Sequence, residues 1–180
     1  MHEHDQAGSA DVLIIGAGIA GLSLATALGR QDFRVSVIDG ASRPEAPKPG
    51  KELQDWDLRV SALTPASIAF LAEIGVWRDA STHRAAPYDC MRVWDASGSG
   101  SIVFDAGEAD ASSLGHIVEN REILQALLQC AQALPCVELC WGHALETMSS
   151  AGSGWLATCS TGREFHTALA IGADGAQSKA

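Results

Sequence analysis

The feature that most constrains the fold is an uncharged run of residues 12–29. It opens with Val12-Leu13-Ile14-Ile15, and such a continuous apolar run predicts a parallel strand buried on both faces. The segment 16–21 follows and reads G-x-G-x-x-G, after which apolar residues at helical spacing continue to Gly29, where we expect the helix to be capped. The run is long enough to be weighed as a membrane span, but its glycines weaken an apolar helix and the acidic residues before it are unlike a signal peptide. A strand, a turn and a helix explain it better.

Each part of this segment has a task in binding a dinucleotide. Gly16 allows the tight turn, Gly18 lets the backbone approach a pyrophosphate, and Gly21 lets helix and strand pack closely. Free N–H groups and the positive dipole end of the helix favour phosphate. Residues 34–38 predict a second strand, and Asp39 at its end can accept hydrogen bonds from a ribose. The pattern therefore predicts a βαβ unit that binds NAD(P) or FAD. The alternative is a glycine-rich turn that binds nothing.

Composition excludes several classes of partner. The chain has 180 residues, of which 47% are hydrophobic, so it can form a core. It carries 22 acidic and 12 basic side chains, a formal net charge of −10, and no basic run, which argues against nucleic acid and against docking on anionic lipid. Its 5 cysteines contain no C-x-x-C pair. We interpret them as small buried residues of a reducing compartment and predict no metal site.

The middle of the chain predicts a strand, a helix and a hairpin. After a Pro- and Gly-rich loop over residues 42–51, residues 58–63 lead into Thr64-Pro65, a helix start, and the helix runs to about residue 74. Arg59 stands just before this helix and can reach a phosphate, although the pattern alone favours a solvent-exposed arginine. Residues 88–94 and 102–105 flank a glycine-containing loop and predict a hairpin.

The remaining residues predict a helix followed by strands. Asn120 caps an amphipathic helix that Pro135 ends, and Arg121 in its first turn is poorly placed for the helix dipole, which indicates that it faces an anion. Residues 137–141, 144–148 and 155–160 predict antiparallel strands. A last strand, residues 165–171, ends in Gly-Ala-Asp-Gly, where ligands bind in open α/β sheets, although Asp-Gly also occurs in plain turns. We expect the 5 tryptophans to lie in the core or at interfaces.

Four segments together resemble the flavin-dependent aromatic hydroxylases with the p-hydroxybenzoate hydroxylase fold, and most of all the ubiquinone-biosynthesis hydroxylases. They are residues 11–21 with Asp39, residues 59–63 with 74–77, residues 114–120, and residues 171–178. With residues 91–95 they look most like the branch that hydroxylates C5 of a polyprenylphenol ring (2-polyprenylphenol 6-hydroxylase). The resemblance implies an α/β fold: a Rossmann-like FAD-binding βαβ unit with a parallel sheet, plus antiparallel β segments.

The resemblance also implies cofactor-binding roles. Gly16, Gly18 and Gly21 would hold the FAD pyrophosphate, and Asp39 the adenosine ribose, at a position where the family more often has Glu. Two arginines would contact the cofactor, and an Asp-Gly pair would serve FAD and NAD(P)H together: Arg59, Arg121, Asp174 and Gly175. No side chain is expected to be catalytic or to bind a metal, because the flavin carries the chemistry.

Two departures from the family pattern indicate a partial chain. The Arg that normally follows the Asp-Gly motif and the later Gly-Asp motif are both absent. We therefore expect residues 1–10 to form a disordered tail and residues 11–180 an FAD-binding domain, with part of a substrate domain inserted at about 85–115 and the C-terminal half of the parent enzyme missing.

The expected function is that of the parent enzyme's FAD-binding part. That enzyme would hydroxylate a polyprenylphenol with NAD(P)H and O2, the chain alone being inactive, in the cytoplasm or peripherally at the inner membrane or in a biosynthetic complex. A cofactor-free fragment or interaction module, and an NAD(P)-binding dehydrogenase domain, are the alternatives.

Overall fold

The computed structural model describes residues 8–46, 55–77, 84–178 and 180. The chain divides into two compact units: residues 1–46 with 127–180, and residues 47–126. The predicted substrate-domain insertion at about 85–115 falls within the second unit and stays a prediction.

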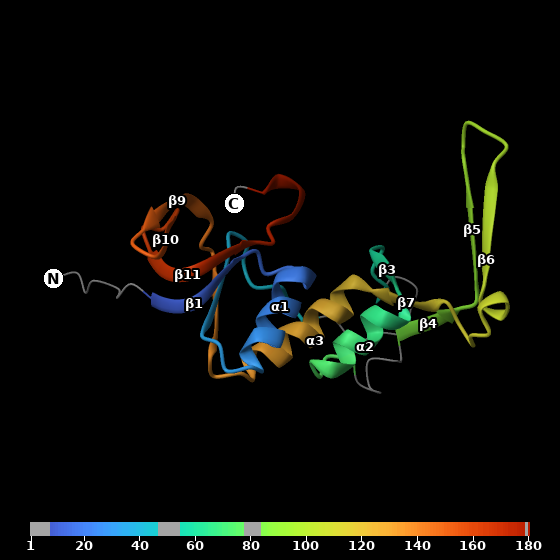
Figure 1. Cartoon of the computed structure of the whole chain (residues 1–180), viewed down its shortest axis with the longest axis horizontal. Coiled ribbons are helices and arrows are strands. Elements are labelled where there is room, and N and C mark those ends of the chain that lie inside the picture. The colour runs from blue at the N-terminus through green and yellow to red at the C-terminus, as the bar shows by residue number, and fades with distance from the viewer. Residues whose placement is uncertain (1–7, 47–54, 78–83, 179) are drawn as a thin grey trace. The chain divides into compact units, whose positions relative to one another are not determined.

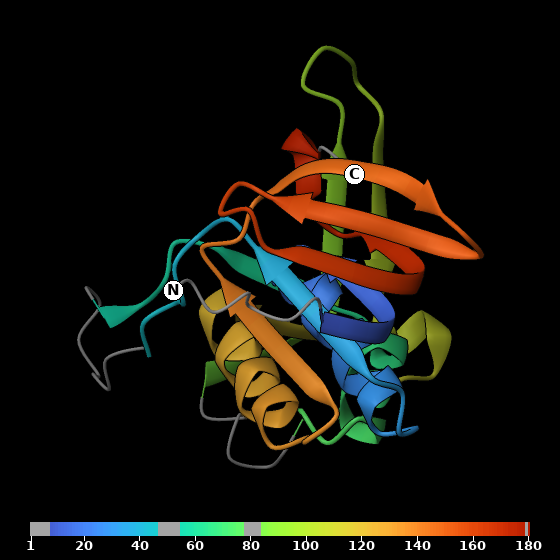
Figure 2. The ribbon, with the colours of Figure 1, turned by 90° about the vertical axis from the view of Figure 1, so that its left-hand side faces the viewer.

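The first unit is built on a six-stranded sheet of order β8-β2-β1-β11-β10-β9. Its strands are β1 (Gly8–Ile15), β2 (Val35–Asp39), β8 (Val137–Trp141), β9 (Leu145–Ala151), β10 (Gly154–Cys159) and β11 (Glu164–Gly172). β8, β2, β1 and β11 run parallel to one another, whereas β10 and β9 are antiparallel to their neighbours (Figure 2). The predicted fold class, a Rossmann-like parallel sheet with antiparallel segments, is confirmed.

The core of this unit lies on both faces of the neighbouring strands β1 and β2. Leu13 and Ile14 point to opposite faces of β1, and both are fully buried. Helix α1 (Ile19–Gly29) and the C-terminal part of α3 (Asn120–Gln132) contribute further buried side chains, among them Leu22 and Leu127. Burial on both faces is the reason why the strand sequence is continuously apolar.

Three details of the first unit differ from the sequence prediction. β8 is parallel to β2 rather than antiparallel, because it follows a helix, and a strand that returns through a helical crossover pairs in parallel. Gly29 is the last residue of α1, and Arg30 caps the helix; Gly29 is small because a side chain there would meet Val137. β1 begins at Gly8 and pairs with β11 from there, so residues 8–10 belong to the sheet rather than to the predicted tail, whose first seven residues lie outside the described ones.

The second unit contains two small antiparallel sheets. β3 (Val60–Leu63), β7 (Gly115–Glu119) and β4 (Ala85–Tyr88) form one sheet in the order β3-β7-β4, and β5 (Cys90–Trp94) pairs with β6 (Ser101–Asp105) in the other. Helix α2 (Pro65–Glu73) begins as predicted: the Thr64 hydroxyl accepts the Ser67 N–H, and Gly75, at φ +80°, follows its end. The short helices η3 (Ala106–Ala109) and η4 (Gly175–Gln177) complete the described elements of the chain.

The predicted hairpin is present as β5 and β6 (Figure 1), but Tyr88 belongs to β4, which pairs with β7. Trp56, Trp94 and Trp155 are 45%, 68% and 41% exposed, so these three do not lie in the core. The cysteines are free, and only Cys140 and Cys159 are fully buried. Among the described residues, no helix is long and apolar enough to cross a membrane and no cluster of side chains is suited to a metal ion.

Candidate functional site

The main candidate site is a pocket of about 520 Å³ at the carboxyl ends of β1, β2 and β11. In an open parallel sheet, ligands bind in the crevice at this edge. The pocket is lined by Ile15, Gly16, Gly18, Ile38, Asp39, Gly40, His143, Ala144, Leu145, Ala173, Asp174 and Gly175. Five of the residues predicted from the sequence therefore line one cavity: Gly16, Gly18, Asp39, Asp174 and Gly175.

Gly16 holds the three strand ends together. Its φ of +109° is a conformation that side chains disfavour, and a Cβ there would collide with the backbone of Ala173. The Gly16 N–H donates to the Ile38 carbonyl at 2.8 Å, and the Ala173 N–H donates to the Ile15 carbonyl at 2.7 Å. The turn that follows β1 is thus bonded to the ends of both neighbouring strands, which fixes the floor of the pocket.

The first turn of α1 supplies unused hydrogen-bond donors. Leu22 N–H makes the first bond of the helix, to the Gly18 carbonyl, and the N–H groups of residues 18–21 have no acceptor in the described part of the chain. No atom lies within 4 Å of the position that a Cβ on Gly18 would take, and Gly18 lines the pocket. Free donors beside open space, at the positive end of the helix, make a place for an anion.

Gly21 has a different role from Gly18. A Cβ on Gly21 would collide with the Gly16 carbonyl oxygen and press on the Ile14 side chain. Helix α1 therefore approaches β1 as closely as it does only because this residue has no side chain. This is the packing task predicted from the motif, and Gly21 does not line the pocket.

Asp39 connects the end of β2 to the glycine turn. Its Oδ2 accepts the Ala17 N–H at 2.8 Å, and its Oδ1 accepts the Ala41 N–H, also at 2.8 Å. A carboxylate has about four acceptor positions, so each oxygen keeps capacity for a ribose hydroxyl. The bond to Ala17 was not predicted from the sequence, although the match to the motif already placed both residues at one edge of the sheet.

Sequence reasoning missed the wall formed by residues 143–145. His143 N–H donates to the Asp39 carbonyl at 2.8 Å, so the turn after β8 continues the pairing with β2 and brings this segment to the pocket. The His143 Nδ1 lies 2.7 Å from the Thr161 hydroxyl. The segment carries no motif, and its position follows from the parallel pairing of β8, which the sequence did not predict.

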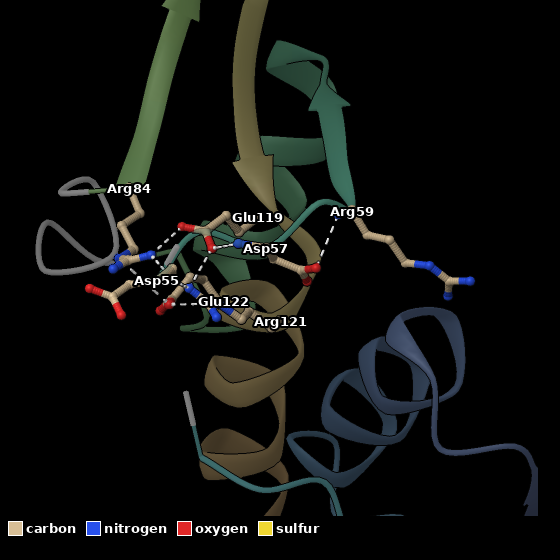
Figure 3. A network of polar contacts seen from close by, with 7 residues as sticks. All are labelled: Asp55, Asp57, Arg59, Arg84, Glu119, Arg121 and Glu122. Carbon is tan, nitrogen blue, oxygen red and sulfur yellow. Dashed lines mark hydrogen bonds and ion pairs between the residues drawn. The ribbon is translucent and has the colours of Figure 1, made fainter. Parts of the chain in front are cut away.

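The two predicted cofactor-contacting arginines lie in the second unit, around the end of β7 (Figure 3). The Arg59 N–H donates to Asp57 Oδ1 at 3.0 Å, and the Arg59 side chain extends away from the other labelled residues. Its guanidinium is exposed and has no hydrogen bond or ion pair with any described residue.

Arg121 is held differently. Its Nη2 lies 2.8 Å from Glu119 Oε2 and also donates to the Asp55 carbonyl, so the anion that it faces in this structure is the Glu119 carboxylate. Burial by itself raises the pKa of Glu119, but the Asp57 N–H and the guanidinium groups of Arg84 and Arg121 together lower it below its usual value. Glu119 is therefore ionised at neutral pH. Cofactor contacts of both arginines stay predictions.

Comparison with known protein families adds a decisive observation: the model of the FAD-binding domain family matches residues 9–180. The chain belongs to this family. The matched residues include the glycine turn and Asp39, and the resemblance stated from the sequence is confirmed at the level of the family.

Curated relatives of this FAD-binding domain include ubiquinone hydroxylases. It is 33% identical over 169 residues to the 3-demethoxyubiquinol 3-hydroxylase of Escherichia coli (strain K12), covering 94% of this chain and 42% of the relative. It is 34% identical over 171 residues to ubiquinone hydroxylase UbiL of Rhodospirillum rubrum, covering 94% of this chain and 38% of the relative. The chain thus spans about two fifths of the length of these relatives.

Solved structures agree on the fold. Pseudomonas aeruginosa PqsL in complex with 2-aminobenzoylacetate superposes with a TM-score of 0.72 at 24% identity, over 96% of this chain and 44% of that one. The flavin-dependent monooxygenase PieE in complex with FAD and substrate gives a TM-score of 0.71 at 20% identity, over 94% of this chain and 31% of that one. At these identities the likeness shows that the FAD-binding domain has the fold of flavin-dependent monooxygenases.

Proposed function

We propose that this chain is the FAD-binding part of a flavin-dependent monooxygenase that hydroxylates a polyprenylated phenol ring in ubiquinone biosynthesis, with NAD(P)H and O2 as co-substrates. The observation that carries the proposal is the pocket at the carboxyl ends of β1, β2 and β11, where unused N–H donors of α1 stand beside the Asp39 carboxylate. The family match and the names of the curated relatives support it.

The residues present fit FAD. The N–H groups of residues 18–21 and the open space beside Gly18 suit a pyrophosphate, and Asp39 suits the adenosine ribose. Asp174 and Gly175 line the same pocket, with Gly175 at φ +77°. The cofactor-contacting roles of Arg59 and Arg121 are carried over from the family resemblance alone.

When bound, the flavin supplies the redox chemistry, and the protein supplies orientation and electrostatics. Backbone N–H groups of α1 would stabilise phosphate charge in a chain whose net charge is −10. The Asp39 carboxylate keeps the turn around Ala17 in place while it accepts ribose hydroxyls. We assign no proton transfer or covalent step to any side chain of this chain.

The finer parts of the proposal concern the whole enzyme. The substrate would be a polyprenylphenol hydroxylated at C5, and the site of action the cytoplasm, with peripheral association with the inner membrane or a biosynthetic complex. The 180 residues alone would bind FAD without completing a turnover, since they span about two fifths of the length of the curated relatives.

FAD titration of the purified chain, followed by flavin fluorescence, tests the proposal. We expect saturable stoichiometric binding, with a rise in the unfolding temperature that grows with FAD concentration. NADPH in place of FAD should give a much smaller effect. A chain that neither quenches flavin fluorescence nor shifts its unfolding temperature with FAD would indicate the alternative, a cofactor-free fragment or interaction module.

A further inference from the structure

We propose that Glu119 is a positioning residue for Arg59: through hydrogen bonds that run along the backbone of residues 57–59, its carboxylate sets the place from which the Arg59 guanidinium extends. This inference rests on the proposed function, in which Arg59 contacts the bound cofactor. It concerns residues of the second unit alone.

The first link is the carboxylate itself. Glu119 ends β7, and its side chain is only 1% exposed. Oε2 accepts the Asp57 N–H at 2.7 Å and lies 2.8 Å from Arg121 Nη2, and Oε1 accepts from Arg84 Nη1 at 2.7 Å. Charged partners converge on both oxygens, so the side chain has one place and the Asp57 N–H has a fixed acceptor.

The second link joins Asp57 to Arg59. Asp57 Oδ1 accepts the Arg59 N–H at 3.0 Å, and the Arg59 carbonyl accepts the Asn120 N–H, also at 3.0 Å. Asn120 is the residue after Glu119, and its Oδ1 accepts the Ser61 hydroxyl at 2.6 Å. Both polar backbone groups of Arg59 are thus tied to the junction of β7 and α3, one through Asp57 and the other directly.

The charges of the cluster explain why Arg59 remains available. Arg84 and Arg121 face Glu119 and Glu122, with N–O separations of 2.7 to 3.9 Å, so the carboxylates of this cluster are already paired with these two guanidinium groups. The Arg59 guanidinium is directed away from this group (Figure 3). Burying a carboxylate costs desolvation free energy, and a well-packed apolar side chain would stabilise the fold at least as well. Its use here is accounted for by the geometry that it imposes on residues 57–59.

Amide hydrogen exchange of the whole chain tests the link directly. In Glu119→Gln, exchange of the Asp57 and Arg59 N–H groups should become about fivefold faster. The Asp57 N–H loses its charged acceptor, so the backbone of residues 57–59 opens more often. The matched control is Glu138→Gln, which makes the same charge change and breaks an ion pair with Arg163 of 2.8 Å in the first unit. It should leave both rates unchanged. Equal exchange at Arg59 in wild type and Glu119→Gln would overturn the proposal.

A second variant tests the same link if Glu119→Gln fails to fold. Asp57→Ala removes the acceptor of the Arg59 N–H from a partly exposed site, and it should speed exchange at Arg59 while leaving the ion pairs of Glu119 in place. If Arg59 stays as protected as in wild type, Asp57 does not transmit the effect and the proposal fails.

A double-mutant cycle on FAD affinity supplies the functional readout. Glu119→Gln should raise the FAD dissociation constant about tenfold in the wild-type background and leave it nearly unchanged in an Arg59→Ala background, because a positioning residue acts through its partner. Additive effects would overturn the proposal. If the wild-type chain does not bind FAD, the proposed function fails, whereas the exchange experiment still decides whether Glu119 positions Arg59.

Discussion

Asp39 and Ala17 are joined by a hydrogen bond of 2.8 Å from the Ala17 N–H to the Asp39 carboxylate, which ties the end of β2 to the glycine turn after β1. The same side chain therefore shapes the turn and presents acceptors to the pocket. The two tasks can be separated experimentally, because the first affects the free protein and the second only the protein with FAD.

Asp39→Ala should destabilise the chain and weaken FAD binding. Loss of the bonds to Ala17 and Ala41 should lower the free energy of unfolding by about 1–3 kcal/mol, measured by urea denaturation without FAD. FAD affinity should fall about tenfold or more in a titration. The matched control is Asp95→Ala, which removes a similar bond to Ser97 N–H in the β5–β6 turn and should leave FAD affinity unchanged. Equal FAD affinity of Asp39→Ala and wild type would refute the ribose contact.

Substitution of Gly18 should impair FAD binding, whereas substitution of Gly21 should impair folding. Gly18→Val places its side chain in open space at an ordinary φ of −77°, so it should fold normally and lose most of its FAD affinity. Gly21→Val drives a side chain into the Gly16 carbonyl and should prevent stable folding. Circular dichroism and FAD titration separate the two, with Gly100→Val as control at an open position of the β5–β6 turn. Normal FAD binding by Gly18→Val would rule out a pyrophosphate at this turn.

Acid should destabilise the chain partly through Glu119. Because the pKa of Glu119 is lowered in the folded protein from an ordinary value of 4.5, its contribution is fully present above that value and is lost as the pH falls through the lower folded pKa. Urea denaturation between pH 6 and about pH 3 should show a steep loss of stability for wild type and a shallower one for Glu119→Gln. If the stability of wild type and of Glu119→Gln falls equally with pH, Glu119 has the same pKa in the folded and unfolded protein.

The cysteines should differ sharply in reactivity. Burial, with the nearby Glu138 carboxylate, raises the pKa of the Cys140 thiol to about 12, and burial also raises the pKa of Cys159. Both stay protonated at ordinary pH, whereas Cys90 is exposed. Iodoacetamide at about pH 8 should modify Cys90 quickly and the two buried thiols only on unfolding, as peptide mass spectrometry would detect. Rapid labelling of Cys140 in the native chain would contradict the burial described.

The sequence was informative where a residue's role is local. The apolar strand, the glycine turn and the cap of α2 by Thr64 each follow from neighbouring residues, and all are found in the structure. The direction of β8 depended on pairing with β2, about a hundred residues earlier, which no local pattern encodes. The same non-local pairing brings His143 to the pocket. The surroundings of Arg121 were only partly readable from the sequence: Glu119 is a near neighbour in the chain, whereas Asp55 meets Arg121 only through a contact between residues 66 positions apart.

The pairing of β1 with β11 also has a consequence for the folding of the chain while it is being translated. The floor of the pocket needs Ala173 against Ile15 and Gly16, so the glycine turn stays incomplete while a ribosome has yet to translate residues 164–175. Contacts this distant in sequence form slowly, because a long loop must close before they are gained. We expect a nascent chain to bind flavin only after residues 164–175 have been translated and paired with β1, and the flavin-free protein to be more sensitive to proteases than the flavin-bound one.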